Sequence, residues 1–549
     1  MRRRRKDSAA SPPAPRPLTP PRRVFVTLAS LAAATVMVRA GLLEPLVGSV
    51  VDAAVRNIIT LILVFSAAMS VLGWFVLESG HSTRAKRLVL GGLVGLVAVA
   101  CAVIRIERVS GDLVPQFMFR WTPSRDRLLP DVTASAEASA GSWEATPSDF
   151  PRFLGPTGSA AIEAPELDPD WKAHPPSPLW RRPIGAGWSG FATCGEHAVT
   201  LEQRGDDEII SCQAIPTGAV EWTVSVSGRH ETVLGGIGPR STPSIAHGTV
   251  YATGATGWLH AIDGSTGRVV WKQNVLKDLG IDPDAHAAAV AWGRAGSPLV
   301  TDSLVIVPGG GPTRDGGGVS LAAYDRLTGA RAWTGGDQQI SYVSPQLVSI
   351  GGREMVLTVN ESSVAGHDPI DGTQQWRFDW PGHSNSDATC SQPHLLDDGR
   401  IFISKGYGIG AALFAAADSD APEFSAVWRQ PSSLKTKFTN VVIHEGFAYG
   451  LSDGVLECVS LADGTRQWKG GRYGQGQVLR VGTLLLVQAE SGEVVAVGCS
   501  PARHAVRGRF EALGGQTWNN LCLSGDRLLV RNAEEAACYR LPLATGATP

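Results

Sequence analysis

Short runs of alternating apolar and polar residues, separated by turns that contain Gly, recur from about residue 150 to the end of the chain. In the clearest stretch, residues 242–247, 249–253 and 258–262 predict three successive β-strands, because the side chains of a strand point alternately to its two faces. The runs are too short for helices of ordinary length. This part of the chain is therefore predicted to be all-β.

The turn after the third strand carries a repeated motif, Asp-x-x-Thr-Gly-x-x-x-Trp. The motif is complete at residues 263–271 and 325–333, nearly complete at 368–376, and lacks its first Asp around Gly218 and Gly464. Asp can accept hydrogen bonds from amides two or three residues further on, and Gly adopts the positive φ that other residues resist. Trp buries a large apolar area between sheets. The motif predicts a tight turn followed by a wedge between neighbouring units.

The aromatic residues of this register count the units. They stand 40 to 62 residues apart at Trp180, Trp222, Trp271, Trp333, Trp376, Trp428, Trp468 and Phe510. Each interval accommodates four short strands, the size of one propeller blade. With the C-terminal strands at 520–523, 528–531 and 537–541, the count predicts an eight-bladed β-propeller. We expect residues 171–183 to close the ring beside those last strands.

The motif resembles the repeat of the PQQ-like (pyrroloquinoline-quinone-type) eight-bladed β-propellers, over about residues 150–549. The resemblance is closest in kind to the non-catalytic propeller of the bacterial outer-membrane assembly machinery. The same family includes quinoprotein dehydrogenases. The resemblance therefore implies the fold and leaves two kinds of function open.

The front of the chain has a different composition. Residues 1–23 are basic and rich in Pro, which predicts a disordered cytoplasmic tail. Residues 24–108 contain apolar stretches at 24–47, 57–77 and 88–104, which predict about three transmembrane helices. A signal peptide is the alternative for the first stretch. Residues 109–149 are predicted to be a linker, and residues 150–549 the propeller.

Charge predicts the orientation in the membrane. Residues 1–108 contain 15 Lys and Arg against 5 Asp and Glu, whereas the rest of the chain contains 34 against 46. Basic flanks stay cytoplasmic, so the propeller of a bacterial inner-membrane protein would be periplasmic. Membrane lipid and other envelope proteins are the expected partners. The acidic propeller argues against nucleic acid, whose phosphates require a basic face.

Motifs of catalysis or metal binding are absent from the sequence. The eight Cys include no Cys-x-x-Cys pair and no adjacent Cys-Cys, the pair found near the cofactor of many quinoprotein alcohol dehydrogenases. No Gly-x-Ser-x-Gly motif or Ser-His-Asp arrangement is evident. Asp282, Asp284 and His286 are interpreted as a solvated polar loop. Hence we expect no catalytic residue and no metal ligand.

A binding site in a propeller is expected where equivalent loops of all blades meet at the mouth of the central channel. The candidate residues, each just before a strand of its blade, are Trp188, Arg240, Arg294, Tyr342, Asp387, Lys437, Asn440, Trp518 and Asn519. Asp387 is the one evident carboxylate among them, against three cations. This set suits an anionic ligand or acidic peptide better than calcium, which needs several oxygen ligands. The alternative is that these residues only fill and hydrate the channel.

Two functions follow from these expectations. The first is a membrane-anchored periplasmic scaffold that binds proteins, uses no cofactor and is not an enzyme. The alternative is a membrane-bound dehydrogenase that uses PQQ with calcium to oxidise an alcohol or a sugar.

Overall fold

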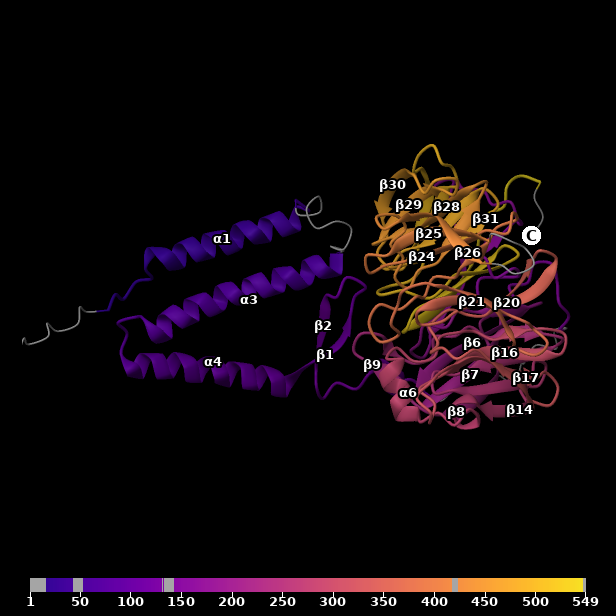
Figure 1. Cartoon of the computed structure of the whole chain (residues 1–549), viewed down its shortest axis with the longest axis horizontal. Helices are drawn as coiled ribbons and strands as arrows, with labels where there is room; N and C mark the ends of the chain where they lie inside the picture. Colours follow the sequence, from indigo (N-terminus) through magenta and orange to yellow (C-terminus); the bar gives the residue numbers. More distant parts are fainter. Residues whose placement is uncertain (1–15, 43–52, 131, 133–142, 417–422, 547–549) are drawn as a thin grey trace, which may run out of the picture. The chain divides into compact units, whose positions relative to one another are not determined.

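The computed structural model of the chain (Figure 1) describes residues 16–42, 53–130, 132, 143–416 and 423–546. The chain forms two compact units. The first comprises residues 1–106 and 117–122, and the second comprises residues 107–116 and 123–549. The predicted disordered tail lies largely outside the described residues.

The first unit contains the apolar helices. They are α1 (Arg22–Arg39), α3 (Ala53–Leu77) and α4 (Thr83–Val103). Among the described residues, two helices rather than three, α3 and α4, are long and apolar enough to cross a membrane. Helix α1 is 18 residues long and has Arg22, Arg23 and Arg39 at its ends, which shortens its apolar centre. After α4 the chain forms a hairpin of β1 (Ile104–Val109) and β2 (Pro115–Phe119).

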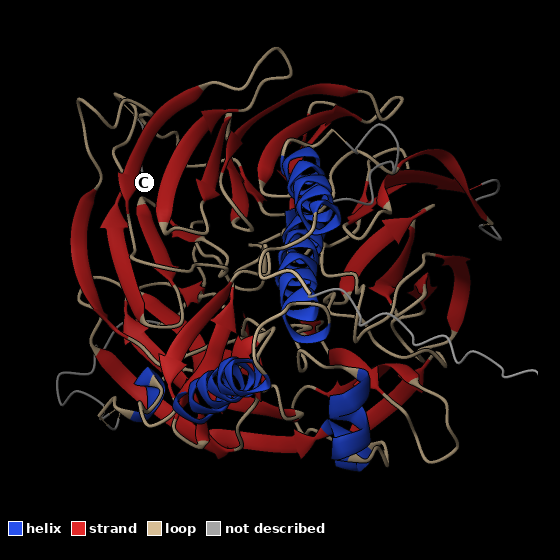
Figure 2. Ribbon diagram, turned by 90° about the vertical axis from the view of Figure 1, so that its left-hand side faces the viewer, coloured by secondary structure: helices blue, strands red, loops and turns tan. Residues whose placement is uncertain are grey.

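The second unit is an eight-bladed propeller, as the repeat count predicts. Figure 2 shows the strands arranged as blades around a centre. Within the described residues, eight sheets each contain the four antiparallel strands of one blade, in sequence order apart from the last sheet, in which an early strand takes the fourth place. One of these sheets has in addition the short parallel strand β3 (Ala161–Ile162). We number the blades 1 to 8 along the chain.

The strands of the first four blades are as follows. Blade 1 has β5 (Ala192–Cys194), β6 (His197–Arg204), β7 (Asp207–Ala214) and β8 (Val220–Ser227). Blade 2 has β11 (Ser244–Ala246), β12 (Thr249–Thr253), β13 (Trp258–Asp263) and β14 (Val269–Asn274). Blade 3 has β15 (Leu299–Val300), β16 (Leu304–Gly310), β17 (Val319–Asp325) and β18 (Arg331–Gly335). Blade 4 has β19 (Gln346–Ile350), β20 (Arg353–Val359), β21 (Ser363–His367) and β22 (Gln374–Asp379).

The other four blades repeat this order. Blade 5 has β23 (His394–Leu395), β24 (Ile401–Lys405), β25 (Gly410–Ala416) and β26 (Phe424–Gln430). Blade 6 has β27 (Val441–His444), β28 (Phe447–Ser452), β29 (Val455–Ser460) and β30 (Arg466–Arg472). Blade 7 has β31 (Gln477–Val481), β32 (Leu484–Gln488), β33 (Glu493–Gly498) and β34 (Val506–Glu511). Blade 8 has β35 (Cys522–Ser524), β36 (Arg527–Arg531), β37 (Glu535–Arg540) and, from the start of the domain, β4 (Ser177–Pro183).

Closure of the ring confirms the expectation for residues 171–183. Strand β4 pairs antiparallel with β37, with Trp180 opposite Cys538. The blade that ends the chain is thus completed by the segment that opens the domain, which closes the ring of blades. First strands of the blades are mostly buried and fourth strands are partly exposed, which places the first strands around the channel.

The repeated turn has the geometry that its residues predict. The Asp263 carboxylate accepts hydrogen bonds from the backbone N and the hydroxyl of Thr266, at 2.9 and 2.7 Å. Gly267 has φ of +69°, and the Gly of every copy lies between +69° and +76°. An added Cβ at any of these glycines would lie 2.4 to 2.8 Å from the Trp ring of the preceding blade. Gly is therefore needed both for its backbone conformation and for the approach of that ring.

The motif Trp residues join neighbouring blades. The indole N–H of Trp222 in blade 1 donates to the backbone oxygen of Gly264 in the turn of blade 2, at 2.7 Å. Trp271 bonds in the same way to Arg326 of blade 3, at 2.9 Å. Trp376 departs from the pattern, because its N–H meets the sulfur of Met355 within blade 4. The predicted wedge between blades is thus confirmed.

One end of the channel is crossed by the segment that precedes β4. Its backbone bonds to blade 1 through Phe150 and Thr193 and to blade 2 through Pro151 and Ile245. Its short strand β3 (Ala161–Ile162) pairs parallel with the first strand of blade 7, on the channel side of that sheet. This segment thus contacts the first strands of blades 1, 2 and 7.

The loops contribute the remaining elements: β9 (Glu231–Thr232), β10 (Gly236–Ile237), α5 (Val275–Asp278), α6 (Pro283–Ala289) and the 3-10 turn η2 (Arg125–Arg127). The supposed polar loop at 282–286 is the start of α6. Asp282 caps this helix by accepting from the backbone N of Ala285 at 2.9 Å, and His286 is buried with its Nδ1 2.8 Å from the Gly311 oxygen. These residues have structural roles.

Candidate functional site

The predicted candidate residues all lie in the loops that join the fourth strand of one blade to the first strand of the next. The first strands line the channel and run in the same sense, so these loops meet at one end of it, which we call the mouth. Each candidate residue precedes the first strand of one blade. The blades and their residues are blade 1 with Trp188, blade 2 with Arg240, blade 3 with Arg294, blade 4 with Tyr342, blade 5 with Asp387, blade 6 with Lys437 and Asn440, and blade 8 with Trp518 and Asn519. The fold thus brings these candidate residues to one end of the channel, but their proximity does not identify a ligand.

A closed belt of hydrogen bonds runs around the mouth and uses several of these loops. The backbone N of Gly190 donates to Thr242, the N of Thr242 to Ser297, and the N of Ser297 to Ser344, at 2.9 to 3.1 Å. The Gln392 amide, in the orientation that satisfies both its groups, pairs with the backbone of Ser344 at 2.9 and 3.1 Å.

The belt continues through blades 5 to 8 and returns to blade 1. Asn440 accepts from the Gln392 backbone N at 3.1 Å, and the Gln477 side chain donates to the Trp518 oxygen at 3.0 Å. Asn519 then donates to the backbone oxygen of Ser189 at 2.8 Å. Asn440 and Asn519, both buried, therefore fasten neighbouring blades together.

The arginines of the mouth are occupied by backbone carbonyl groups. Arg294 is 2% exposed and donates to the oxygens of Pro308 and Gly309. Arg240 donates to the oxygens of Gly235 and Gly238, each at 2.6 Å. Burial lowers the pKa of both guanidinium groups to about 10, so both stay charged at neutral pH. An anionic ligand would have to compete with these carbonyl groups.

Aromatic rings cover much of the remaining surface of the mouth. The ring of Trp518 lies 4.7 Å from that of Trp188 and 4.7 Å from that of Phe438, centroid to centroid. On the other side, Trp292 and Tyr342 are 5.3 Å apart. The Tyr342 hydroxyl donates to the Ser384 oxygen at 2.6 Å, and burial raises its pKa far above the ordinary value. These rings offer apolar contact and few free polar groups.

The tip of the β1–β2 hairpin, residues 107–116, belongs to the propeller unit and sits at this mouth. The Glu490 carboxylate accepts from the backbone N of Gly111 and from the indole of Trp518, at 2.9 and 3.0 Å. The Gln516 amide donates to the Val109 oxygen at 3.0 Å. Burial and the nearby carboxylates of Asp453 and Glu490 raise the pKa of Asp112 at the tip. The chain thus covers part of its own mouth.

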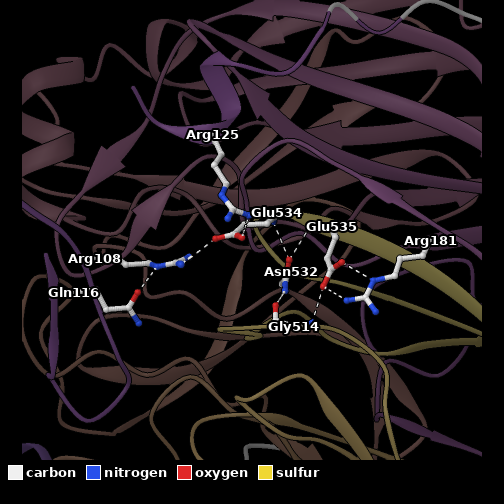
Figure 3. A network of polar contacts seen from close by, with 8 residues as sticks. All are labelled: Arg108, Gln116, Arg125, Arg181, Gly514, Asn532, Glu534 and Glu535. Atoms are coloured by element: carbon white, nitrogen blue, oxygen red, sulfur yellow. Dashed lines mark hydrogen bonds and ion pairs between the residues drawn. The ribbon is translucent and has the colours of Figure 1, made fainter. Parts of the chain in front are cut away.

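Ion pairs fasten the base of this tip to blade 8, as Figure 3 shows. Arg108 donates to Glu534 at 2.9 Å, and Arg125 pairs with the second oxygen of the same carboxylate. Asn532 shapes the turn, because its side-chain oxygen accepts from the backbone N of Glu534 and Glu535, each at 2.9 Å. Beside this clamp lies a hollow of about 610 Å³, lined by Arg108, Arg125, Leu128, Leu129, Arg181, Arg182, Pro183, Ile184, Gly514, Gly515, Glu534 and Glu535.

The mouth does not have the donor set of a calcium-bound quinone. Asp387 is paired with Lys405 at 3.2 Å, Asp453 lies 3.9 Å from Lys437, and Glu490 holds the hairpin tip. Among the described residues, no three carboxylate or imidazole groups of the mouth converge within 4.8 Å. Calcium takes six to eight oxygen ligands. The residues present therefore do not fit the cofactor of the quinoprotein dehydrogenases.

No sequence motif predicted the hairpin tip, the clamp or the belt. Glu490, Glu534 and Gln516 stand in no motif, and each meets a partner hundreds of residues away, such as Val109 or Arg108. A signal for the belt does exist in retrospect: a Ser, Thr, Asn or Gln precedes the first strand of almost every blade.

Comparisons with known proteins agree with this architecture. Residues 206–470 match the family described as "Outer membrane protein assembly factor BamB". A search of curated proteins finds no significant match. Among solved structures, a quinohemoprotein alcohol dehydrogenase from Pseudomonas putida HK5 is 10% identical with a TM-score of 0.53, over 72% of this chain and 81% of that one. BamB from Moraxella catarrhalis is 15% identical with a TM-score of 0.48, over 67% of this chain and 100% of that one.

Identities this low concern the fold alone, and the two similar structures differ in function. The match to the repeat family, the eight blades and the turn motif at its expected geometry agree with one another. Residues 206–470 of this chain are thus similar to the family described as "Outer membrane protein assembly factor BamB", and the chain folds as an eight-bladed β-propeller.

Proposed function

We propose that this protein is a membrane-anchored propeller of the bacterial envelope that binds other envelope proteins and catalyses no reaction. The observation that carries the proposal is the covered mouth. Glu490 and Gln516 hold the hairpin tip where a small-molecule substrate of a propeller would enter. The belt also engages Asn440, and backbone carbonyl groups engage the terminal nitrogens of Arg294.

Membrane anchoring is supported by the first unit. Helices α3 and α4 each contain an apolar stretch long enough to cross a membrane, and the described residues of α4 include none that is buried. The hairpin that follows exposes Phe117, Phe119 and Trp121, with the last two rings stacked at 5.0 Å. Aromatic residues concentrate where membrane helices meet water. The basic residues of the N-terminus then favour a cytoplasmic N-terminus and a periplasmic propeller.

The partner surface that we propose lies on the turn face, the end of the propeller that carries the repeated turns. Leu327 and Ile370, in the turns of blades 3 and 4, are 67% and 82% exposed. Both stand at variable positions of the motif, so the turn does not require them to be apolar. Contiguous exposed apolar patches mark protein-binding surfaces, and we propose that these two side chains contribute to one.

The test is to titrate the purified full-length protein with PQQ and calcium, and then to assay dye reduction with a panel of alcohols and sugars. We expect neither saturable binding of PQQ nor turnover. A Glu490→Ala variant, which loosens the hairpin tip, is expected to give the same negative result. Tight PQQ binding with turnover in either protein would overturn the proposal and establish the dehydrogenase alternative.

A further inference from the structure

A cluster of three potential metal ligands lies inside blade 1, away from the mouth. His197 begins β6, Cys212 is in β7 and Glu221 is in β8. The Glu221 carboxylate lies 2.7 Å from the Nδ1 of His197 and 3.2 Å from the Sγ of Cys212. The three ligand atoms lie within 4.8 Å of one another, and all three residues are buried. Three strands thus present a nitrogen, a sulfur and an oxygen to one point.

The cluster is incompletely satisfied by the protein. Among the described residues, neither the second carboxylate oxygen of Glu221 nor the Nε2 of His197 has a hydrogen-bond partner, and both atoms are buried. A buried polar atom without a partner costs about 1–3 kcal/mol. The described residues also show no Lys or Arg paired with Glu221, whose only ion-pair partner is the His197 ring. A cation bound by the carboxylate would supply Glu221 with the positive partner that no Lys or Arg among the described residues provides.

The repeat itself shows that blade folding does not require this cluster. Cys212 faces the blade Trp, Trp222, across the sheet, and Cys458 in blade 6 and Cys538 in blade 8 face their Trp residues in the same way. In blade 8, however, the residues that correspond to His197 and Glu221 are Arg527 and Leu179, and in blade 6 they are Phe447 and Gln467. Only blade 1 adds two metal-ligating side chains to the shared Cys.

An aromatic ring from outside the blade covers the cluster. Trp143 stacks on the His197 ring, with centroids 4.7 Å apart and planes 13° from parallel. The same ring packs so tightly against the turn of blade 2 that an added Cβ on Gly264 would lie 2.4 Å from it. This cover keeps bulk water from competing for the ligand atoms.

We propose that His197, Cys212 and Glu221 form a binding site for one zinc ion. Imidazole with thiolate favours zinc over calcium or magnesium, which prefer oxygen ligands. Three protein ligands leave the fourth tetrahedral position to water or to the second oxygen of Glu221. A thiolate and a carboxylate together neutralise a divalent ion, so the loaded site carries no net charge in the blade interior.

Loading requires two small changes. Burial and the Glu221 charge raise the pKa of the Cys212 thiol well above its ordinary value, so without metal the thiol keeps its proton and donates a hydrogen bond to Glu221. When the ion binds, the S–H bond breaks, a sulfur–zinc bond forms and the proton passes to solvent. Ligand atoms on a tetrahedral zinc are about 3.3 Å apart, so the 2.7 Å contact between His197 and Glu221 must open slightly.

The experiment uses the full-length protein, purified in detergent, reduced and stripped with a chelator. Cobalt(II) is added as a spectroscopic substitute for zinc. We expect one equivalent to bind per chain with a thiolate-to-cobalt charge-transfer band, and zinc to displace it. Elemental analysis after zinc loading and dialysis is expected to give one zinc per chain. Both signals are expected to be lost in Cys212→Ser, and zinc retention to fall at least tenfold in His197→Gln and in Glu221→Gln.

Cys538→Ser is the matched control, because Cys538 is buried at the same place of its own blade and faces Trp180. Its cobalt spectrum is expected to match that of the unmodified protein. Absence of the charge-transfer band and of retained zinc in the unmodified protein overturns the proposal, and the cluster is then a hydrogen-bonded triad only. A band that survives Cys212→Ser also overturns it, because the ion must then be bound by another thiol.

Discussion

The approach of each motif Trp to a Gly of the next blade can be tested with two glycines of blade 2. Gly267 and Gly248 have nearly the same backbone conformation, with φ of +69° and +71°. An added Cβ at Gly267 would lie 2.6 Å from the Trp222 ring, whereas at Gly248 it would meet nothing within 4 Å. Replacement by Ala therefore costs the same backbone strain at both positions and adds a clash at only one.

The magnitudes follow from this difference. An L-residue in the left-handed region costs about 1–2 kcal/mol, of which reduced freedom of the unfolded chain offsets about 0.4–1 kcal/mol. Gly248→Ala should thus destabilise by about 1 kcal/mol. Gly267→Ala adds about 1–3 kcal/mol for an overpacked interior. It also strains the buried bond from Trp222 to the Gly264 oxygen. We expect Gly267→Ala to be less stable than Gly248→Ala by about 2 kcal/mol.

The assay is urea unfolding of both purified variants and the unmodified protein, followed by Trp fluorescence. Far-ultraviolet circular dichroism first checks that all three have the same strand content. Equal losses of unfolding free energy in the two variants would refute the reasoning, because glycine would then be required only for its φ. A larger loss at Gly248 would refute it as well.

Three further predictions concern charge, the clamp and the partner surface. Burial raises the pKa of the Glu208 carboxyl from 4.5 to about 7, so between these pH values the folded protein holds a proton that the unfolded chain releases. The stability of the protein should therefore fall as pH rises from 4.5 to about 7. In Glu208→Gln, the melting temperature should depend less on pH over that range. Glu534→Ala removes both ion pairs of the clamp, each worth at most about 1 kcal/mol. The variant should be cleaved by trypsin after Arg125 about fivefold faster than the unmodified protein, as measured by mass spectrometry. The control variant Glu493→Ala should be cleaved there at the unmodified rate. A photo-crosslinking residue in place of Ile370 should form adducts with another envelope protein in native membranes. The same residue in place of Trp188, in the covered mouth, should form none. The opposite pattern would contradict the proposal that the turn face is the partner-binding surface.

The blade architecture could be predicted from the sequence because it depends on local interactions. The Asp263 turn forms within four residues, and the strand patterns on either side of it span five or six residues. The spacing of the Trp residues then fixed the number of blades. The membrane segment was predicted less well, since Arg39 made the extent of the first apolar stretch ambiguous and α1 ends at that residue.

The candidate site was predicted only in part. The place of these residues in the loops before the first strands follows from the order of strands, but the interactions of the side chains there were not predictable. That they bind a ligand or partner stays a prediction. Arg294 points to carbonyl groups of its own blade, and Asn519 bonds across the closure of the ring to Ser189. The three residues of the proposed zinc site are 9 to 24 positions apart in no known motif, so only the pairing of three strands brings them together.

The sequence by itself determined the repeating unit, the number of blades and the closure of the ring, because periodic apolar positions and turn residues act over short distances. The tertiary structure alone decided what occupies the mouth and which polar groups remain free. Those outcomes depend on contacts between residues such as Gly111 and Glu490, which are 379 positions apart. No local pattern records such a contact, because it exists only after the ring has closed and the hairpin tip has docked on it.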